Sequence, residues 1–114
     1  KKMKLDTSKY KITLMTEAVC PSCQEIQQLF DNNLIKYQNK CITAQLPPDY
    51  TVNKENAANR WEFHDLATKY PDKVSNTPVM IVEDLEGNQE IFSAGAGYET
   101  PQQALELVHN NYCI

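Results

Sequence analysis

The stretch Glu17-Ala18-Val19-Cys20-Pro21-Ser22-Cys23 decides the fold, because it places two cysteines between two patterns of different period. Residues 11–16, just before it, alternate in the way that is typical of a β-strand. Just after it, apolar side chains recur at helical spacing, at Cys23, Ile26, Phe30 and Leu34. Pro21 falls in the first turn of that helix, where a missing N–H costs no hydrogen bond. The stretch therefore predicts a strand-to-helix junction that carries a Cys-x-x-Cys pair.

This position predicts redox chemistry for the pair. The first turn of a helix offers unpaired backbone N–H groups and the positive end of the macrodipole, and both favour a thiolate. We therefore expect Cys20 to be the exposed nucleophile of low pKa, which attacks a substrate disulfide. Cys23 lies on the apolar stripe, so we expect it to be the shielded thiol that resolves the mixed disulfide. Two alternatives stay open: a zinc half-site, which would need further ligands, and a pair of inert core thiols.

The rest of the chain completes the order βαβαββα. The elements predicted after the junction are a strand at 41–46, a helix at 57–70, strands at 78–82 and 89–93, and a last helix from Thr100. Trp61 and Tyr70 are expected among the buried residues of the helix at 57–70, because they lie at apolar spacing. Gly95-Ala96-Gly97 breaks the pattern before the last helix. That helix is predicted to begin with Thr100 as N-cap, Pro101 at N1 and Gln103 at N3 in capping-box position.

Composition narrows the classes of partner. The chain has 114 residues, 11 Lys and Arg against 15 Asp and Glu, and a formal net charge of −4. Such an acidic chain is a poor phosphate binder, so we expect no nucleic acid partner. No apolar run approaches the roughly 18 residues of a membrane span. We expect a monomer with one domain at 10–114, preceded by a flexible, solvated tail at 1–9.

With these motifs in place, the chain resembles the thioredoxin superfamily over about residues 10–112. The landmarks, in order, are the strand leading into Cys20-Pro21-Ser22-Cys23, the segment Val74-Ser75-Asn76-Thr77-Pro78 and the Gly87-Asn88 hairpin. The resemblance implies an α/β, thioredoxin-like fold whose four-stranded mixed sheet has helices on both faces. It also implies that the Thr77–Pro78 bond is cis and that both residues lie beside Cys20, where Thr77 binds substrate through its backbone.

The proline directly after the first cysteine is similar to glutaredoxins, whose glutathione site uses a Thr-Val-Pro segment and a glycine turn. This chain has Thr77-Pro78-Val79 and Gly95-Ala96-Gly97, a partial match, with Glu17 where that family has a basic residue. The resemblance implies that Gly95 and Gly97 help to bind substrate and keeps glutathione as a candidate co-substrate.

The expected function is a thiol–disulfide oxidoreductase that exchanges the Cys20–Cys23 dithiol or disulfide with protein or glutathione disulfides. Pro21 and Ser22 complete its motif, a partner reductase or oxidase recycles it, and no dissociable cofactor is needed. The alternative is a thioredoxin-fold binding or metal-carrier module whose two cysteines hold Zn or Cu(I), and a third hypothesis is a structural interaction domain.

Two cysteines stand outside the motif. If the second strand starts at Cys41 and the last helix ends near Cys113, both lie at the end of the domain opposite the active site. A structural disulfide between them would close a loop of about 70 residues and stabilise the fold by around 4 kcal/mol. Such a bond would indicate an extracytoplasmic or secretory compartment, whereas its absence would favour the cytoplasm.

Overall fold

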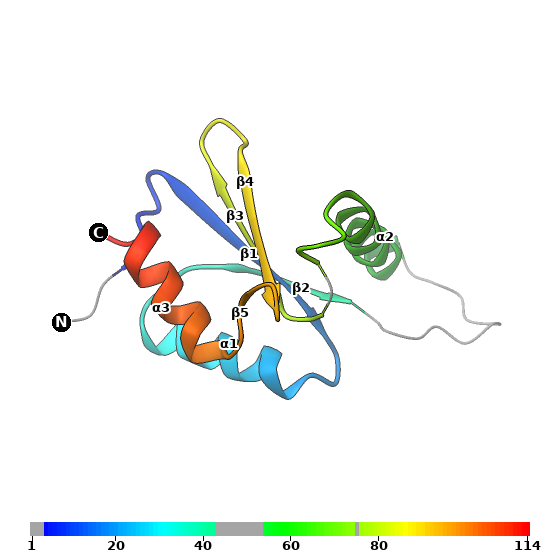
Figure 1. Cartoon of the computed structure of the whole chain (residues 1–114), viewed down its shortest axis with the longest axis horizontal. Helices are drawn as coiled ribbons and strands as arrows, with labels where there is room; N and C mark the ends of the chain where they lie inside the picture. Colours follow the sequence, from blue (N-terminus) through cyan, green and yellow to red (C-terminus); the bar gives the residue numbers. More distant parts are fainter. Residues whose placement is uncertain (1–3, 43–53, 75) are drawn as a thin grey trace.

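The computed structural model describes residues 4–42, 54–74 and 76–114, the helical stretch 54–59 by its backbone only. Residues 43–46 of the predicted second strand and 1–3 of the predicted tail lie outside the described residues. The elements follow the predicted order with one added strand (Figure 1). They are β1 (Tyr10–Glu17), α1 (Pro21–Asn32), β2 (Gln38–Ile42), α2 (Lys54–Lys69), β3 (Val79–Asp84), β4 (Gln89–Ala94), β5 (Gly97–Tyr98) and α3 (Pro101–Tyr112).

The strands form one mixed sheet in the order β2-β1-β3-β4-β5. Strand β1 is parallel to β2 and antiparallel to β3, and β3 is antiparallel to β4. The sheet has five strands rather than the predicted four, because β5 turns back beside β4 as a short parallel strand. Backbone hydrogen bonds within the turn explain this: the Ser93 N–H donates to the Ala96 carbonyl, and the Gly95 N–H to the Tyr98 carbonyl.

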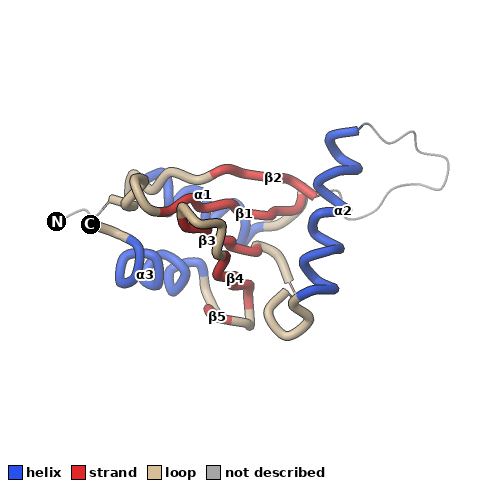
Figure 2. The backbone as a smooth tube through the Cα atoms, turned by 90° about the horizontal axis from the view of Figure 1, so that it is seen from above, coloured by secondary structure: helices blue, strands red, loops and turns tan. Residues whose placement is uncertain are grey.

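Side chains of the central strands alternate between two faces, and each face has its own apolar core. Helices α1 and α3 cover one face, and α2 lies apart from them (Figure 2). The buried cluster under α1 and α3 includes Ile12, Leu14, Ile26, Phe30, Met80, Val82, Leu105 and Val108. Helix α2 packs on the other face, where Leu66 joins Met15, Ile42, Val79, Ile81 and Ile91. This mixed sheet with helices on both faces confirms the predicted α/β, thioredoxin-like fold class.

The buried side of α2 and the residue after it confirm the predicted packing of Tyr70, whereas the prediction for Trp61 is wrong. Phe63, Leu66 and Ala67 lie at helical spacing and pack against the sheet, followed by Tyr70 just after the helix. Trp61 is 65% exposed, so its predicted burial is wrong. The reason is its position two residues before Phe63, which is about 200° around the helix and therefore away from the sheet.

The N-terminal segment contributes to the core instead of being a tail throughout. Leu5 is only 4% exposed and pairs by its backbone with Cys113. The neighbouring Asp6 N–H donates to the Tyr112 carbonyl at 3.0 Å. The expectation of a solvated tail at 1–9 is therefore corrected at Leu5 and Asp6. Burying a leucine contributes on the order of 2 kcal/mol, which favours docking of this segment on the sheet.

Candidate active site

The two motif cysteines lie where β1 has ended and α1 begins. Cys20 is the N-cap of α1, with extended backbone angles of φ −149° and ψ 94°, and Pro21 follows in the first turn. The Cys23 backbone N–H donates to the Cys20 Sγ at 3.2 Å. A side-chain atom that accepts from the N3 backbone is the normal arrangement of an N-cap, so here a sulfur takes the part that a serine or aspartate oxygen usually has.

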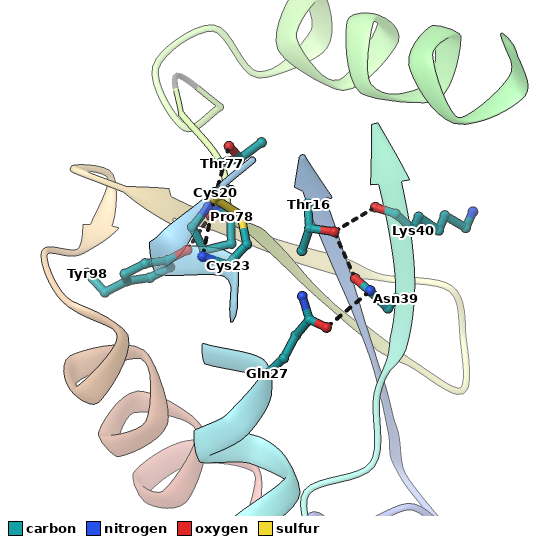
Figure 3. Close-up of a disulfide and its surroundings, with 9 residues drawn as sticks. All are labelled: Thr16, Cys20, Cys23, Gln27, Asn39, Lys40, Thr77, Pro78 and Tyr98. Carbon is teal, nitrogen blue, oxygen red and sulfur yellow. Dashed lines mark hydrogen bonds between the residues drawn. A yellow bond between two sulfur atoms is a disulfide. The ribbon is translucent and has the colours of Figure 1, made fainter. Parts of the chain in front are cut away.

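Cys20 and Cys23 are joined in a disulfide, with their Cα atoms 5.2 Å apart (Figure 3). Cys20 is 7% exposed and Cys23 is 1% exposed. In the disulfide form Cys20 is thus slightly more accessible than Cys23, but it is buried, so the expectation that Cys20 is exposed is corrected. The residues beside it are accessible instead: Val19 is 91% exposed, and Pro21 and Ser22 are exposed as well.

The segment that leads into β3 faces this disulfide. The Thr77–Pro78 peptide bond is cis, as predicted. The Thr77 Oγ1 lies 3.8 Å from the Cys20 Sγ, at the limit of a hydrogen bond to sulfur (Figure 3). Residues far apart in the sequence are thus brought together, because β1 and β3 are neighbours in the sheet. The role of the Thr77 backbone in binding substrate stays a prediction.

The two glycines after β4 shape the turn on the other side of Pro78. Gly97 has φ +114°, and a Cβ there would lie 2.7 Å from the Phe92 ring, so any side chain would be both strained and crowded. Gly95 has φ +86° with open space beside it. Next to Gly97, the Tyr98 hydroxyl donates a hydrogen bond to the Pro78 carbonyl. The glycines therefore set the turn that brings Tyr98 to the Pro78 segment. A contact of Gly95 and Gly97 with substrate stays a prediction.

A polar chain on the α1 side of the sheet was missed by sequence reasoning. Thr16 is only 2% exposed, and its hydroxyl donates to the Asn39 Oδ1 at 3.0 Å. The Asn39 amide donates in turn to the Gln27 Oε1 at 3.3 Å, on the helix that begins at the disulfide (Figure 3). A threonine at an inward position of an apolar strand is a sequence signal for such a bond, because a buried hydroxyl needs a partner.

The other two cysteines do not meet. Strand β2 begins at Gln38, earlier than predicted, and its parallel register places Cys41 opposite Thr16 near the disulfide end of β1. Cys113 lies instead beside Leu5, ahead of β1 at the opposite end of the sheet. Both are free thiols. The predicted Cys41–Cys113 disulfide is therefore wrong, and the argument for an extracytoplasmic or secretory location that rested on it is withdrawn.

Within residues 4–42, 54–74 and 76–114, no three or more His, Cys, Asp or Glu side chains gather into a group that could hold a metal ion. Across those same ranges, no helix combines the length and the apolar character that crossing a membrane requires.

Comparisons with known proteins add little to this geometry. No family model matches the chain, and no curated protein matches it either. A solved structure titled "DsbH Oxidoreductase" is similar at a TM-score of 0.48 and 13% identity, over 89% of this chain and 71% of that one. The fold class rests on the sheet order and the helix positions.

Proposed function

We propose that this protein is a thiol–disulfide oxidoreductase that exchanges its Cys20–Cys23 pair with disulfides of other proteins. The observation that carries the proposal is the position of the Cys20 sulfur at the N-terminus of α1. There it accepts the Cys23 N–H at 3.2 Å and faces the Thr77 hydroxyl at 3.8 Å. Both groups, together with the macrodipole of α1, stabilise negative charge on that sulfur.

In the reducing direction, the Cys20 thiolate attacks one sulfur of a substrate disulfide. That S–S bond breaks, a mixed disulfide forms, and the released substrate sulfur takes up a proton. The Cys23 thiolate then attacks the Cys20 sulfur, which frees the second substrate thiol and forms the Cys20–Cys23 disulfide. Two electrons and two protons pass in total from the protein dithiol to the substrate. In the oxidising direction, a substrate dithiol runs the same steps in reverse.

The unequal accessibility of the two sulfurs supports these roles. An incoming sulfur approaches Cys20, at 7% exposure, more readily than Cys23 at 1%. Val19, which is 91% exposed, offers an apolar contact next to the reacting sulfur. We propose that an extended substrate segment lies between Val19 and Thr77, with Gly95 and Gly97 at its margin. Protein disulfides are the proposed substrates, a reductase or oxidase recycles the pair, and glutathione is a further co-substrate to test.

The proposal is tested by an insulin-reduction assay and a dithiol-oxidation assay on the protein and three variants. We expect Cys20→Ser to reduce both activities to background, because the attacking sulfur is gone. Cys23→Ser should instead accumulate a mixed disulfide between Cys20 and the substrate, visible as an added mass that reductant removes. Cys113→Ser is the matched control, because it replaces a free thiol at the opposite end, and it should keep full activity.

The same variants also distinguish the proposed function from the metal-carrier alternative. Equal activity in Cys20→Ser and the unsubstituted protein would overturn the proposal. Activity absent from every form, together with one equivalent of zinc or copper lost in both Cys20→Ser and Cys23→Ser, would favour a carrier instead. Adding reduced or oxidised glutathione to the same assays shows whether it serves as a co-substrate.

A further inference from the structure

Tyr98 is a buried tyrosine close to the redox pair that the chemistry above does not use. It is 5% exposed and its ring belongs to the apolar cluster under α1 and α3. Its backbone is fixed as well, because it pairs with Ala94 in the β4–β5 ladder and its carbonyl accepts the Gly95 N–H. The ring therefore has one defined position relative to the sheet.

The hydroxyl of this ring points at the segment that faces the disulfide. It donates to the carbonyl of Pro78, which is itself among the fully buried side chains (Figure 3). Burial raises the pKa of the Tyr98 phenol above its ordinary value. The phenol therefore stays protonated, and stays a donor, throughout the neutral and mildly alkaline range in which thiols react.

Pro78 directly follows Thr77, whose hydroxyl lies 3.8 Å from the Cys20 sulfur. We propose that Tyr98 is a positioning residue that, through the Pro78 carbonyl, holds the Thr77 hydroxyl against Cys20 and so sets the acidity of that thiol. The proposal rests on the proposed function for its biological meaning, because only a reacting Cys20 would need such control.

The contact between Thr77 and Cys20 acts on the reduced form of the protein. A thiolate has no hydrogen, so in any hydrogen bond between the two groups Thr77 must donate to it. Hydrogen bonds to charged acceptors are stronger than bonds to neutral ones, so a well-placed Thr77 lowers the pKa of Cys20. Freeing the Pro78 carbonyl lets the segment shift. Because the Thr77 Oγ1 already lies 3.8 Å from the Cys20 Sγ, a small shift is enough to break this hydrogen bond. Removing the Tyr98 hydroxyl should therefore weaken this bond without touching either sulfur.

The test is the pH dependence of Cys20 alkylation in the reduced protein, with the labelled positions identified by fragmentation mass spectrometry. Tyr98→Phe keeps the ring and removes only the hydroxyl. We expect it to raise the midpoint by about 0.5 pH units, which is roughly threefold slower labelling below the midpoint. Tyr112→Phe is the matched control, because it also removes the hydroxyl of a buried tyrosine, which donates to Glu90 at 2.6 Å at the opposite end. It should leave the midpoint unchanged.

A double-mutant cycle separates positioning from general loosening. Thr77→Val should raise the midpoint at least as much as Tyr98→Phe, and Thr77→Ser should restore it. The double variant should shift no further than Thr77→Val alone, because residues that act through one another are non-additive. Equal shifts in Tyr98→Phe and Tyr112→Phe, fully additive shifts, or no shift in Thr77→Val would each overturn the proposal. The last result does so even if Tyr98→Phe fails to fold.

Alkylation requires no turnover, so this experiment does not depend on the activity assays. If Cys20→Ser keeps full activity, the proposed function fails, whatever the alkylation midpoints are. If activity needs Cys20 but the midpoints do not move, the proposed function stands and the role of Tyr98 fails.

Discussion

The two ends of the sheet are held by different kinds of interaction. At the end where β1 leads into α1, polar groups converge on a sulfur, as the contact between Thr77 and Cys20 illustrates. At the opposite end, which we call the apolar end, the two terminal segments join through backbone hydrogen bonds and apolar contacts: Leu5 is buried, and the rings of Tyr10 and Tyr112 lie 5.0 Å apart between centroids. The difference suggests that reactivity and stability are controlled by separate residues. Substitutions at one end should leave the property of the other end unchanged.

The largest effect is expected at the apolar end. Leu5→Ala should lower the free energy of unfolding by about 2–5 kcal/mol, because it removes a buried leucine from a packed core. Leu85→Ala is the matched control, since Leu85 is 81% exposed and its loss should cost no more than about 0.5 kcal/mol. Urea unfolding measures both. The alkylation midpoint of Cys20 in folded Leu5→Ala should equal that of the unsubstituted protein, and a shifted midpoint would show that the two ends are coupled.

The two free thiols, one near each end of the sheet, should differ in their rate of alkylation. Without reductant, two cysteines per chain should react with an alkylating reagent, Cys41 and Cys113. Cys41 is exposed, whereas burial raises the pKa of the Cys113 thiol. Cys41 should therefore be labelled severalfold faster at pH 7, and Cys113 should catch up as the pH rises. Protection of both thiols until reductant is added would instead indicate a disulfide between them.

What could be predicted from the sequence depended on distance along the chain. The Cys20–Cys23 junction and the capping box of Thr100 and Gln103 are set by neighbouring residues, and both are present as expected. The pairing of Cys41 with Cys113 depended on where β2 begins, and starting that strand at Gln38 moved Cys41 to the disulfide end of the sheet. An error of a few residues in the predicted start of a strand is therefore enough to place a residue at the wrong end of the sheet.

Contacts between distant segments were beyond sequence reasoning for a different reason. Nothing local indicates that Leu5 docks beside Cys113, because its pairing partner is at the other end of the chain. Likewise, the hydrogen bond from Tyr98 to Pro78 exists only because the chain loops round after β4 and places β5 beside it as a parallel strand. The sequence break at Gly95-Ala96-Gly97 predicted a turn there, but not the direction in which the chain leaves it.

Asp84 offers the finest test, because it lies in the hairpin at the apolar end. Its carboxylate accepts the backbone N–H groups of Glu86 and Asn88, both at 2.9 Å, and the Asn88 side-chain amide at 3.0 Å. The hydrogen bond from the Asn88 side chain has the largest effect, followed by the backbone bonds, and together they lower the pKa of Asp84 below its ordinary value of 3.8. Because all of these donors stabilise the charged form, protonation should weaken the hairpin.

A lowered pKa in the folded state means that the unfolded chain binds the proton more tightly, so acid favours unfolding. The contribution of Asp84 should be fully present above its ordinary pKa of 3.8 and should be lost as the pH falls below that value through the lowered pKa. We expect a small effect, because the carboxylate lies at the surface, where solvent screens its interactions. Thermal unfolding from pH 6 to pH 2 measures it: the acid-induced fall in Tm should be smaller in Asp84→Asn than in the unsubstituted protein.

Asp72→Asn is the control, because it makes the same change of charge in an exposed turn after α2. Its plot of Tm against pH should follow that of the unsubstituted protein, apart from a constant offset. Parallel profiles for all three proteins would show that Asp84 does not hold the hairpin. Cys20 alkylation midpoints that differ among them would show that the hairpin influences the disulfide end.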